Sequence, residues 1–69
     1  MNNTLLRKLM RQRKITQEQM ADRLGIDRST FSRKINTETG KGFCLREASE
    51  IGHALGLTPV QMADVFFDL

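Results

Sequence analysis

The chain has 69 residues, a length that suits one domain with a small hydrophobic core, so we expect residues 1–69 to form a single domain. Its 39% hydrophobic residues, 28% charged residues and one proline are typical of a folded domain and exclude a disordered tail. It lacks an apolar run of transmembrane length and a signal-peptide core, so we expect a cytoplasmic protein. Cys44 is the single cysteine and cannot form an internal disulfide, and with His53 it provides too few ligands for zinc. We therefore expect neither a metal nor a cofactor.

The charges are segregated along the chain. Residues 1–41 carry ten Lys/Arg and four acidic residues, a balance of +6, whereas residues 42–69 carry one Arg and four acidic residues, a balance of −3. A basic first half suits a polyanionic partner such as nucleic acid. A plain solvated surface would explain the net charge, but it accounts less well for the segregation.

The first predicted element is an amphipathic helix with Asn3 or Thr4 as its N-cap and its end near Arg13. Apolar residues recur on one face, which we expect to be buried: Leu5, Leu6, Leu9 and Met10. Basic residues occupy the other faces, either as solubilising charges or as contacts to phosphate: Arg7, Lys8, Arg11 and Lys14.

A second helix is predicted to begin at Thr16, which forms a capping box with Gln19, while Ile15 and Met20 have the spacing of a hydrophobic staple. Its inward face consists of Met20, Ala21 and Leu24. Gly25 ends it in the left-handed conformation that helix ends favour. Ile26 then fills the turn, and the connection is short enough to force a sharp corner.

A third helix is predicted from Arg28 to about Ile35, with the Asp27 side chain accepting from the amide of Ser29 or Thr30. Phe31 and Ile35, four positions apart, anchor it to the core. At about 100° per residue, the polar residues share one continuous arc: Arg28, Ser29, Ser32, Arg33 and Asn36. A purely structural surface helix would carry stronger helix formers, whereas short polar side chains flanked by arginines suit base edges and phosphates.

The stretch from Thr37 to Gly42 is a polar loop whose amides and Lys41 could contact a phosphate, or it is a plain connector. A fourth helix is predicted from about Leu45 to Leu55 and closed by Gly56, with these residues inward: Leu45, Ala48, Ile51, Ala54 (or Gly52) and Leu55. Cys44 lies near its N-cap, where we expect a buried or half-buried inert thiol, and His53 is expected on the surface.

A fifth, short helix is predicted after Thr58, which forms a capping box with Gln61 and is followed by Pro59 at the first helical position. Leu57 and Met62 repeat the staple. The helix is expected to end within the segment Val65-Phe66-Phe67-Asp68-Leu69. Phe66 and Phe67 cannot both face one core, so one closes the monomer and the other is a candidate for a subunit contact.

The segments ITQEQMADRLGIDRSTFSRKIN and LREASEIGHALGLTPVQM resemble the lambda-repressor-like helix-turn-helix family, of Cro/CI or XRE type. The resemblance covers nearly the whole chain and rests on the Thr-Gln opening, the small Ala21, Gly25 in the turn and the Ser/Thr-rich third helix. It implies an all-α, compact five-helix DNA-binding domain whose helix-turn-helix is formed by the second and third helices.

By this resemblance, Arg28, Ser29 and Arg33 face the bases, and Ser32 lines the same groove. Gln17 would hold a phosphate and brace the third helix, and three later residues are further candidates for phosphate contacts: Asn36, Thr37 and Lys41.

The chain departs from the family pattern at two places. Met10 and Ile35 replace an arginine and a glutamate that often pair, which implies an apolar contact there. Lys34 stands where the family is usually apolar. Either its stem lies along the core edge with the ammonium outside, or a small rotation of the third helix lets Ile35 take over the packing, which would change the place of Arg33.

The resemblance implies a sequence-specific transcriptional regulator, similar to a short phage Cro-like protein, without a second domain. One recognition helix reads few base pairs, so we expect a weak dimer or a dimer formed on an operator. The alternative is an antirepressor that contacts another repressor through Phe66, Phe67 and the acidic second half, although the basic third helix favours DNA. No carboxylate pair, activated nucleophile or Gly-rich phosphate loop indicates an enzyme.

Overall fold

A computed structural model describes residues 1–37 and 42–67 of the chain, and every regular element within them is helical. Lys41 and the last two residues of the predicted fifth helix, residues 68 and 69, lie outside the described part. The elements follow the predicted order: α1 (Asn3–Gln12), α2 (Gln17–Leu24), α3 (Arg28–Ile35), α4 (Leu45–Leu55), α5 (Pro59–Met62) and a π-helical turn, η1 (Ala63–Phe67). The all-α, five-helix fold is therefore confirmed.

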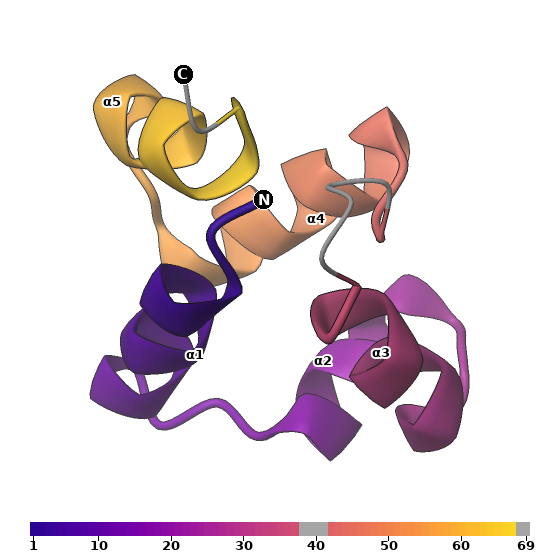
Figure 1. Cartoon of the computed structure of the whole chain (residues 1–69). Coiled ribbons are helices and arrows are strands. Elements are labelled where there is room, and N and C mark those ends of the chain that lie inside the picture. The colour runs from indigo at the N-terminus through magenta and orange to yellow at the C-terminus, as the bar shows by residue number, and fades with distance from the viewer. Residues whose placement is uncertain (38–41, 68–69) are drawn as a thin grey trace.

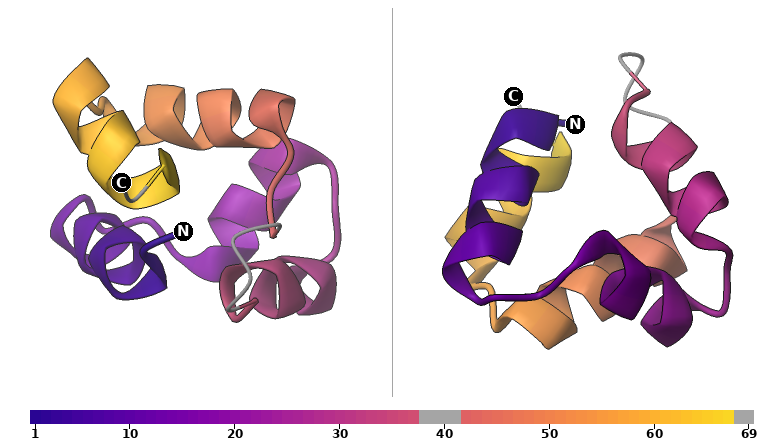
Figure 2. Two further views of the ribbon diagram at one scale, coloured as in Figure 1. Left: turned by 45° about the horizontal axis from the view of Figure 1, so that its top comes forward. Right: turned by 90° about the horizontal axis from the view of Figure 1, so that it is seen from below.

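The helices surround one core (Figure 1). α2 packs against both α3 and α4, and η1 lies beside α1. As a result, the start of α1 and η1 lie side by side (Figures 1 and 2). A hydrogen bond of 2.6 Å from the backbone N–H of Asn2 to the carbonyl oxygen of Val65 joins them.

Helix α1 begins one residue earlier than predicted, because its N-cap is Asn2 rather than Asn3 or Thr4. The Oδ1 atom of Asn2 accepts from the backbone N–H of Leu5 at 3.0 Å. The hydrogen bond from the N–H of Asn2 to Val65 fixes the backbone of Asn2, and Val65 lies near the other end of the sequence. The helix ends at Gln12, with Arg13 as its C-cap.

Helix α2 begins as predicted. Thr16 Oγ1 accepts from the backbone N–H of Gln19 at 3.1 Å, and Gln19 Oε1 accepts from the backbone N–H of Thr16 at 2.9 Å. The capping box therefore satisfies two amides that a helix start leaves without partners. At the other end, Gly25 has φ 72°, a left-handed conformation that costs glycine little. The chain then reverses within residues 25–27 and enters α3.

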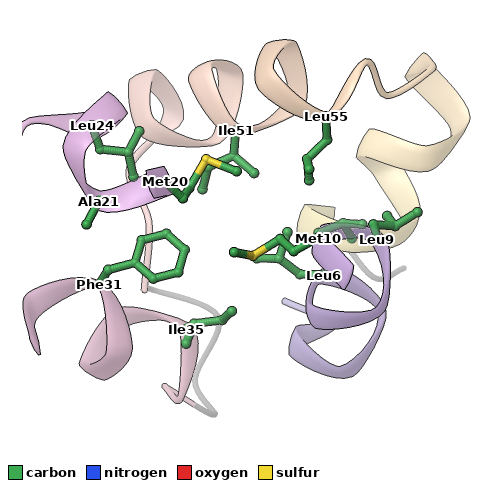
Figure 3. Close-up of a cluster of buried hydrophobic side chains, with 11 residues drawn as sticks. Leu6, Leu9, Met10, Met20, Ala21, Leu24, Phe31, Ile35, Ile51 and Leu55 are labelled. Atoms are coloured by element: carbon green, nitrogen blue, oxygen red, sulfur yellow. The ribbon is translucent and has the colours of Figure 1, made fainter. Parts of the chain in front are cut away.

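The core is apolar throughout and drawn from α1, α2, α3, α4 and η1 (Figure 3). It contains both residues that replace the family's ion pair, Met10 and Ile35, and an apolar cluster is confirmed at that place. Its eleven buried members are Leu6, Leu9, Met10, Met20, Ala21, Leu24, Phe31, Ile35, Ile51, Leu55 and Val65. Leu5, which was expected to be buried with them, is half-buried at the edge.

The prediction for the inward face of α4 was wrong at its first residue. Leu45 is 75% exposed, whereas Glu47, which was not expected inside, is only 6% exposed. The buried face starts at Glu47 and continues through Ala48, Ile51, Gly52 and Leu55, while Ala54 is half-buried. A buried glutamate needs a charged partner, and the partner comes from α3. Cys44 is the N-cap of α4 but is exposed, which corrects the expectation of a buried or half-buried thiol.

Helix α5 is short and continues into η1. Thr58 Oγ1 accepts from the backbone N–H of Gln61 at 3.2 Å, and Pro59 is the first helical residue, both as predicted. Within η1, Val65 is buried, Phe66 is half-buried against the core and Phe67 is 54% exposed. Among the described residues, no helix has both the length and the apolar character needed to cross a bilayer.

Candidate nucleic-acid interface

The orientation of α3 is set by two core residues. Phe31 and Ile35 are completely buried, and Figure 3 shows both side chains pointing from α3 into the core. The helix begins at the predicted place, since the carbonyl oxygen of Asp27 accepts from the backbone N–H of Phe31 at 2.9 Å. Its predicted side-chain cap is absent, however, because the exposed Asp27 carboxylate makes no capping hydrogen bond. Core packing and the sharp turn after Gly25 therefore position α3 without that cap.

The opposite side of α3 carries a polar surface that we call the recognition face; it comprises Arg28, Ser29, Ser32, Arg33 and Asn36. Ser32 is half-buried and the other four are exposed, so the face is accessible along the whole helix. Arg33 Nη2 donates to Thr30 Oγ1 at 3.3 Å, which holds the guanidinium against its own helix. The structure thus brings together on one side of α3 the residues that the sequence predicted to share one arc.

Two predicted phosphate contacts lie at the end of α3. Thr37 Oγ1 donates to the carbonyl oxygen of Arg33 at 3.0 Å, so its hydroxyl completes the last turn. Asn36 Oδ1 accepts from Arg7 Nη2, which reaches across from α1. That bond engages the amide oxygen of Asn36 and leaves the role of donor to its NH₂ group. No local sequence pattern predicts this hydrogen bond, because the two residues are 29 positions apart.

Gln17 is the first residue of α2 and is half-buried. It lines a shallow hollow together with Arg7, Met10, Arg11 and Ile15. Two arginine side chains and the start of α2, the end of a helix that favours negative charge, therefore line one hollow. Such a surface is suited to an anion.

The side chain of Lys34 adopts neither of the two placements that the sequence predicted. Its Nζ lies 2.9 Å from Oε1 and 2.8 Å from Oε2 of Glu47, and its side chain is 31% exposed. The ammonium is therefore paired with α4 rather than free in solvent. Ile35 packs in the core without displacing Arg33, which remains exposed on the recognition face.

Glu47 was missed as a structural residue. Its Oε1 also accepts from the backbone N–H of Cys44 at 3.1 Å. Burial raises the pKa of Glu47, but the hydrogen bonds from Lys34 and Cys44 outweigh burial, so that the pKa lies below its ordinary value. The spacing Cys44-x-x-Glu47, with a glutamate at the third position of a helix, was the available signal.

Arg13 was also missed. Its Nε donates to the carbonyl oxygen of Leu55 at 3.0 Å and so caps the end of α4. Arg13, one of the basic residues in the first half of the chain, therefore stabilises the fold. Among the other basic residues, Arg28 and Arg33 belong to the recognition face, and Arg7 contacts that face through Asn36.

Comparison with known proteins agrees with this geometry. The family model described as a Cro/C1-type helix-turn-helix DNA-binding domain matches residues 5–68. The match covers α2 to α5 and η1 completely, and α1 except for its first two residues. No curated protein and no solved structure matches the chain.

Proposed function

The chain belongs to the Cro/C1-type helix-turn-helix DNA-binding family, and we propose that it is a sequence-specific transcriptional regulator that places α3 in the major groove of an operator. The observation that carries this proposal is the exposed recognition face, held outward by the buried Phe31 and Ile35. An α-helix fits the major groove, where each base pair presents a distinct set of donors and acceptors.

Within this proposal, Arg28 and Arg33 contact guanines, because the guanidinium fork matches O6 and N7 of that base. Ser29 and Ser32 line the same groove. The backbone phosphates are held by residues at its edges, which fix the register of the helix on the duplex: Gln17, Asn36, Thr37 and Lys41.

A dimer is part of the proposal, because one recognition helix reads only a few base pairs. Two copies on half-sites about 34 Å apart would read enough sequence for a specific operator. An apolar surface is available for the contact between copies: Leu45 and Phe67 are exposed large hydrophobic residues, and both line one groove. We call this the apolar groove; it is lined by Met1, Phe43, Leu45, Ala48, Phe66 and Phe67.

The second candidate is an antirepressor that binds another repressor, and the same apolar groove is the observation that favours it. A protein partner would cover Phe67 and Leu45 as well as a second copy of this chain would. The recognition face argues against a purely protein-binding role, because a protein-binding modulator does not need two exposed arginines and two serines on one helix. We therefore infer that DNA binding is the function and that the groove serves the dimer, in a small regulator of the kind found in phages.

The experiment that tests the proposal is selection of duplexes from a random-sequence pool by the purified protein, followed by footprinting of the enriched sequence. The expected result is a pseudo-palindromic sequence protected on one face, with affinity that falls steeply as salt rises. A pool that enriches no sequence, together with co-purification of a repressor, would favour the antirepressor.

A further inference from the structure

Lys34 and Glu47 connect the end of α3 to the start of α4. Both carboxylate oxygens of Glu47 lie within hydrogen-bond distance of Lys34 Nζ, and the Glu47 side chain is only 8% exposed. A buried charge that accepts two short, charge-assisted bonds is more strongly oriented than an exposed pair. The chain also contains an exposed pair for comparison, since Arg23 Nε lies 3.8 Å from Glu50 Oε2 with both side chains about half exposed.

Two further contacts join α3 to the segment that leads into α4. A Cβ atom added to the buried Gly42 would collide with the carbonyl oxygen of Lys34, so the backbone after residue 41 passes directly against the end of α3. The rings of Phe31 and Phe43 are 5.2 Å apart between centroids and tilted by 47°. The segment from Gly42 to Glu47 therefore contacts α3 in three ways: through its backbone at Gly42, through the ring of Phe43 and through the carboxylate of Glu47.

We propose that the Lys34–Glu47 pair is a positioning device, which fixes the rotation of α3 about its axis and so sets the selectivity of the recognition face without contacting DNA. Lys34 follows Arg33 directly and projects about 100° further round the helix. A restraint on Lys34 is therefore also a restraint on the direction of Arg33 and Ser32. The proposal rests on the proposed DNA-binding function.

Lys34 is a lysine on a recognition helix, where a contact to phosphate would be the ordinary expectation. To reach a phosphate, its ammonium would have to leave Glu47, and a buried carboxylate would then lose its charged partner. The Cys44 N–H would remain as one donor to Glu47, which is insufficient for a group with two acceptor oxygens. We expect Lys34 to stay on Glu47 when DNA binds.

The test compares Lys34→Met and Glu47→Gln with two controls, Glu50→Gln in the exposed pair and Arg46→Met, which removes one charge elsewhere. Binding is measured over a salt series, to the duplex that the wild-type protein enriches from a random pool and to a scrambled duplex of equal composition. Circular dichroism melting first establishes the temperature at which each variant is folded. Amide NMR spectra of the free proteins report the position of α3 in the absence of DNA.

Both variants are expected to lower the ratio of the two affinities by about tenfold while leaving the salt dependence as in wild type. Glu47→Gln is also expected to move the amide signals of Arg28 and Ser29, which lie at the far end of α3 from the substitution. The controls should change neither the affinity ratio nor those signals.

A double variant, Lys34→Met with Glu47→Leu, separates positioning from stability. Apolar replacement of a buried pair commonly restores stability, so we expect wild-type melting. The affinity ratio should stay low, because apolar contacts do not orient α3 as two hydrogen bonds do.

Three outcomes would overturn the proposal. If Lys34→Met lowers the slope of log affinity against log salt by about one, Lys34 contacts a phosphate. A wild-type affinity ratio in the folded double variant would show that the pair only stabilises the fold. Unmoved α3 signals in Glu47→Gln would show that the pair does not position the helix. This last readout needs no DNA, so it tests the positioning of α3 by the pair separately from the proposed DNA-binding function.

Discussion

The guanidinium of Arg7 on α1 donates a hydrogen bond to Oδ1 of Asn36, the C-cap residue of α3. Arg7 and Gln17 also line the same hollow. One side chain thus connects two of the predicted phosphate contacts. This arrangement extends the proposed DNA-binding surface from the helix-turn-helix onto α1.

Replacing Arg7 by methionine should weaken binding to all duplexes alike. The substitution frees the Asn36 amide to rotate and removes a charge beside the phosphates, and neither change affects a base contact. We expect the slope of log affinity against log salt to fall by about one. Titration by fluorescence anisotropy at several salt concentrations measures it, with Arg46→Met on α4 as the charge-matched control. A loss confined to the enriched duplex would contradict this role.

Replacing Arg28 by alanine should change which bases are preferred. Arg28 is exposed at the start of α3, and a bidentate contact from arginine to guanine contributes roughly 1–3 kcal/mol of discrimination. Repeating the pool selection with the variant should show one base position per half-site losing its preference. Lys41→Ala serves as the contrast, since loss of a phosphate contact lowers affinity evenly across sequences. An unchanged base preference would show that Arg28 does not contact a base.

Replacing Arg13 by methionine should lower the free energy of unfolding by about 1 kcal/mol, the typical contribution of one hydrogen bond. The lost bond is the one from Arg13 Nε to the carbonyl oxygen of Leu55, which caps α4. Urea unfolding followed by circular dichroism measures the change. Arg11→Met, on an exposed part of α1, is the stability control. Equal stability of the Arg13 variant and wild type would mean that water caps α4 as well as Arg13 does.

Acid should destabilise the wild-type protein more than the Glu47→Gln variant. The pKa of Glu47 is lowered in the folded state, so the unfolded chain binds a proton at this residue at higher pH than the folded chain does. The contribution of Glu47 to stability is therefore complete above its unfolded pKa and is lost as pH falls through the folded pKa. We expect the stability difference between wild type and Glu47→Gln to shrink below about pH 5. A difference that is independent of pH between 7 and about 3 would contradict the assignment.

Replacing Phe67 by serine should weaken the dimer without changing the affinity for a single half-site. Phe67 is exposed in the apolar groove and Leu45 lies in the same groove, so Leu45→Ser should act in the same way. We expect each variant to bind a single half-site as wild type does and to lose cooperative binding to two. Sedimentation on duplexes with one and two half-sites distinguishes these cases. The exposed Val60, which does not line the groove, provides the control variant Val60→Ser. Retained cooperativity in both groove variants would place the dimer contact elsewhere.

Local sequence signals predicted the starts of α2 and α5. Thr16 with Gln19, and Thr58 with Gln61, are reciprocal hydrogen-bonded pairs three residues apart, so the sequence alone contains both partners. The same holds for Gly25, whose left-handed conformation depends on its own backbone. The recognition face was also predictable, because helical periodicity fixes which residues lie opposite Phe31 and Ile35.

Three other features were not predicted because they depend on contacts between distant segments. Leu45 and Glu47 both lie near the start of α4, and hydrophobicity favours the leucine as the buried residue. Glu47 is buried because Lys34, thirteen positions away, supplies its counter-charge. Asn2 is the N-cap because Val65 accepts from its N–H, and Arg13 is structural because Leu55 lies beside it. No local pattern contains these partners.

The most direct test of the central claim is selection of duplexes from a random pool by the wild-type protein and by Arg28→Ala, followed by footprinting of each enriched sequence. The account predicts that wild type enriches a pseudo-palindrome with half-sites about 34 Å apart, and that the variant loses preference at one position in each half. Enrichment of no sequence by wild type, or the same sequence from both proteins, would contradict the claim that α3 reads DNA through its exposed face.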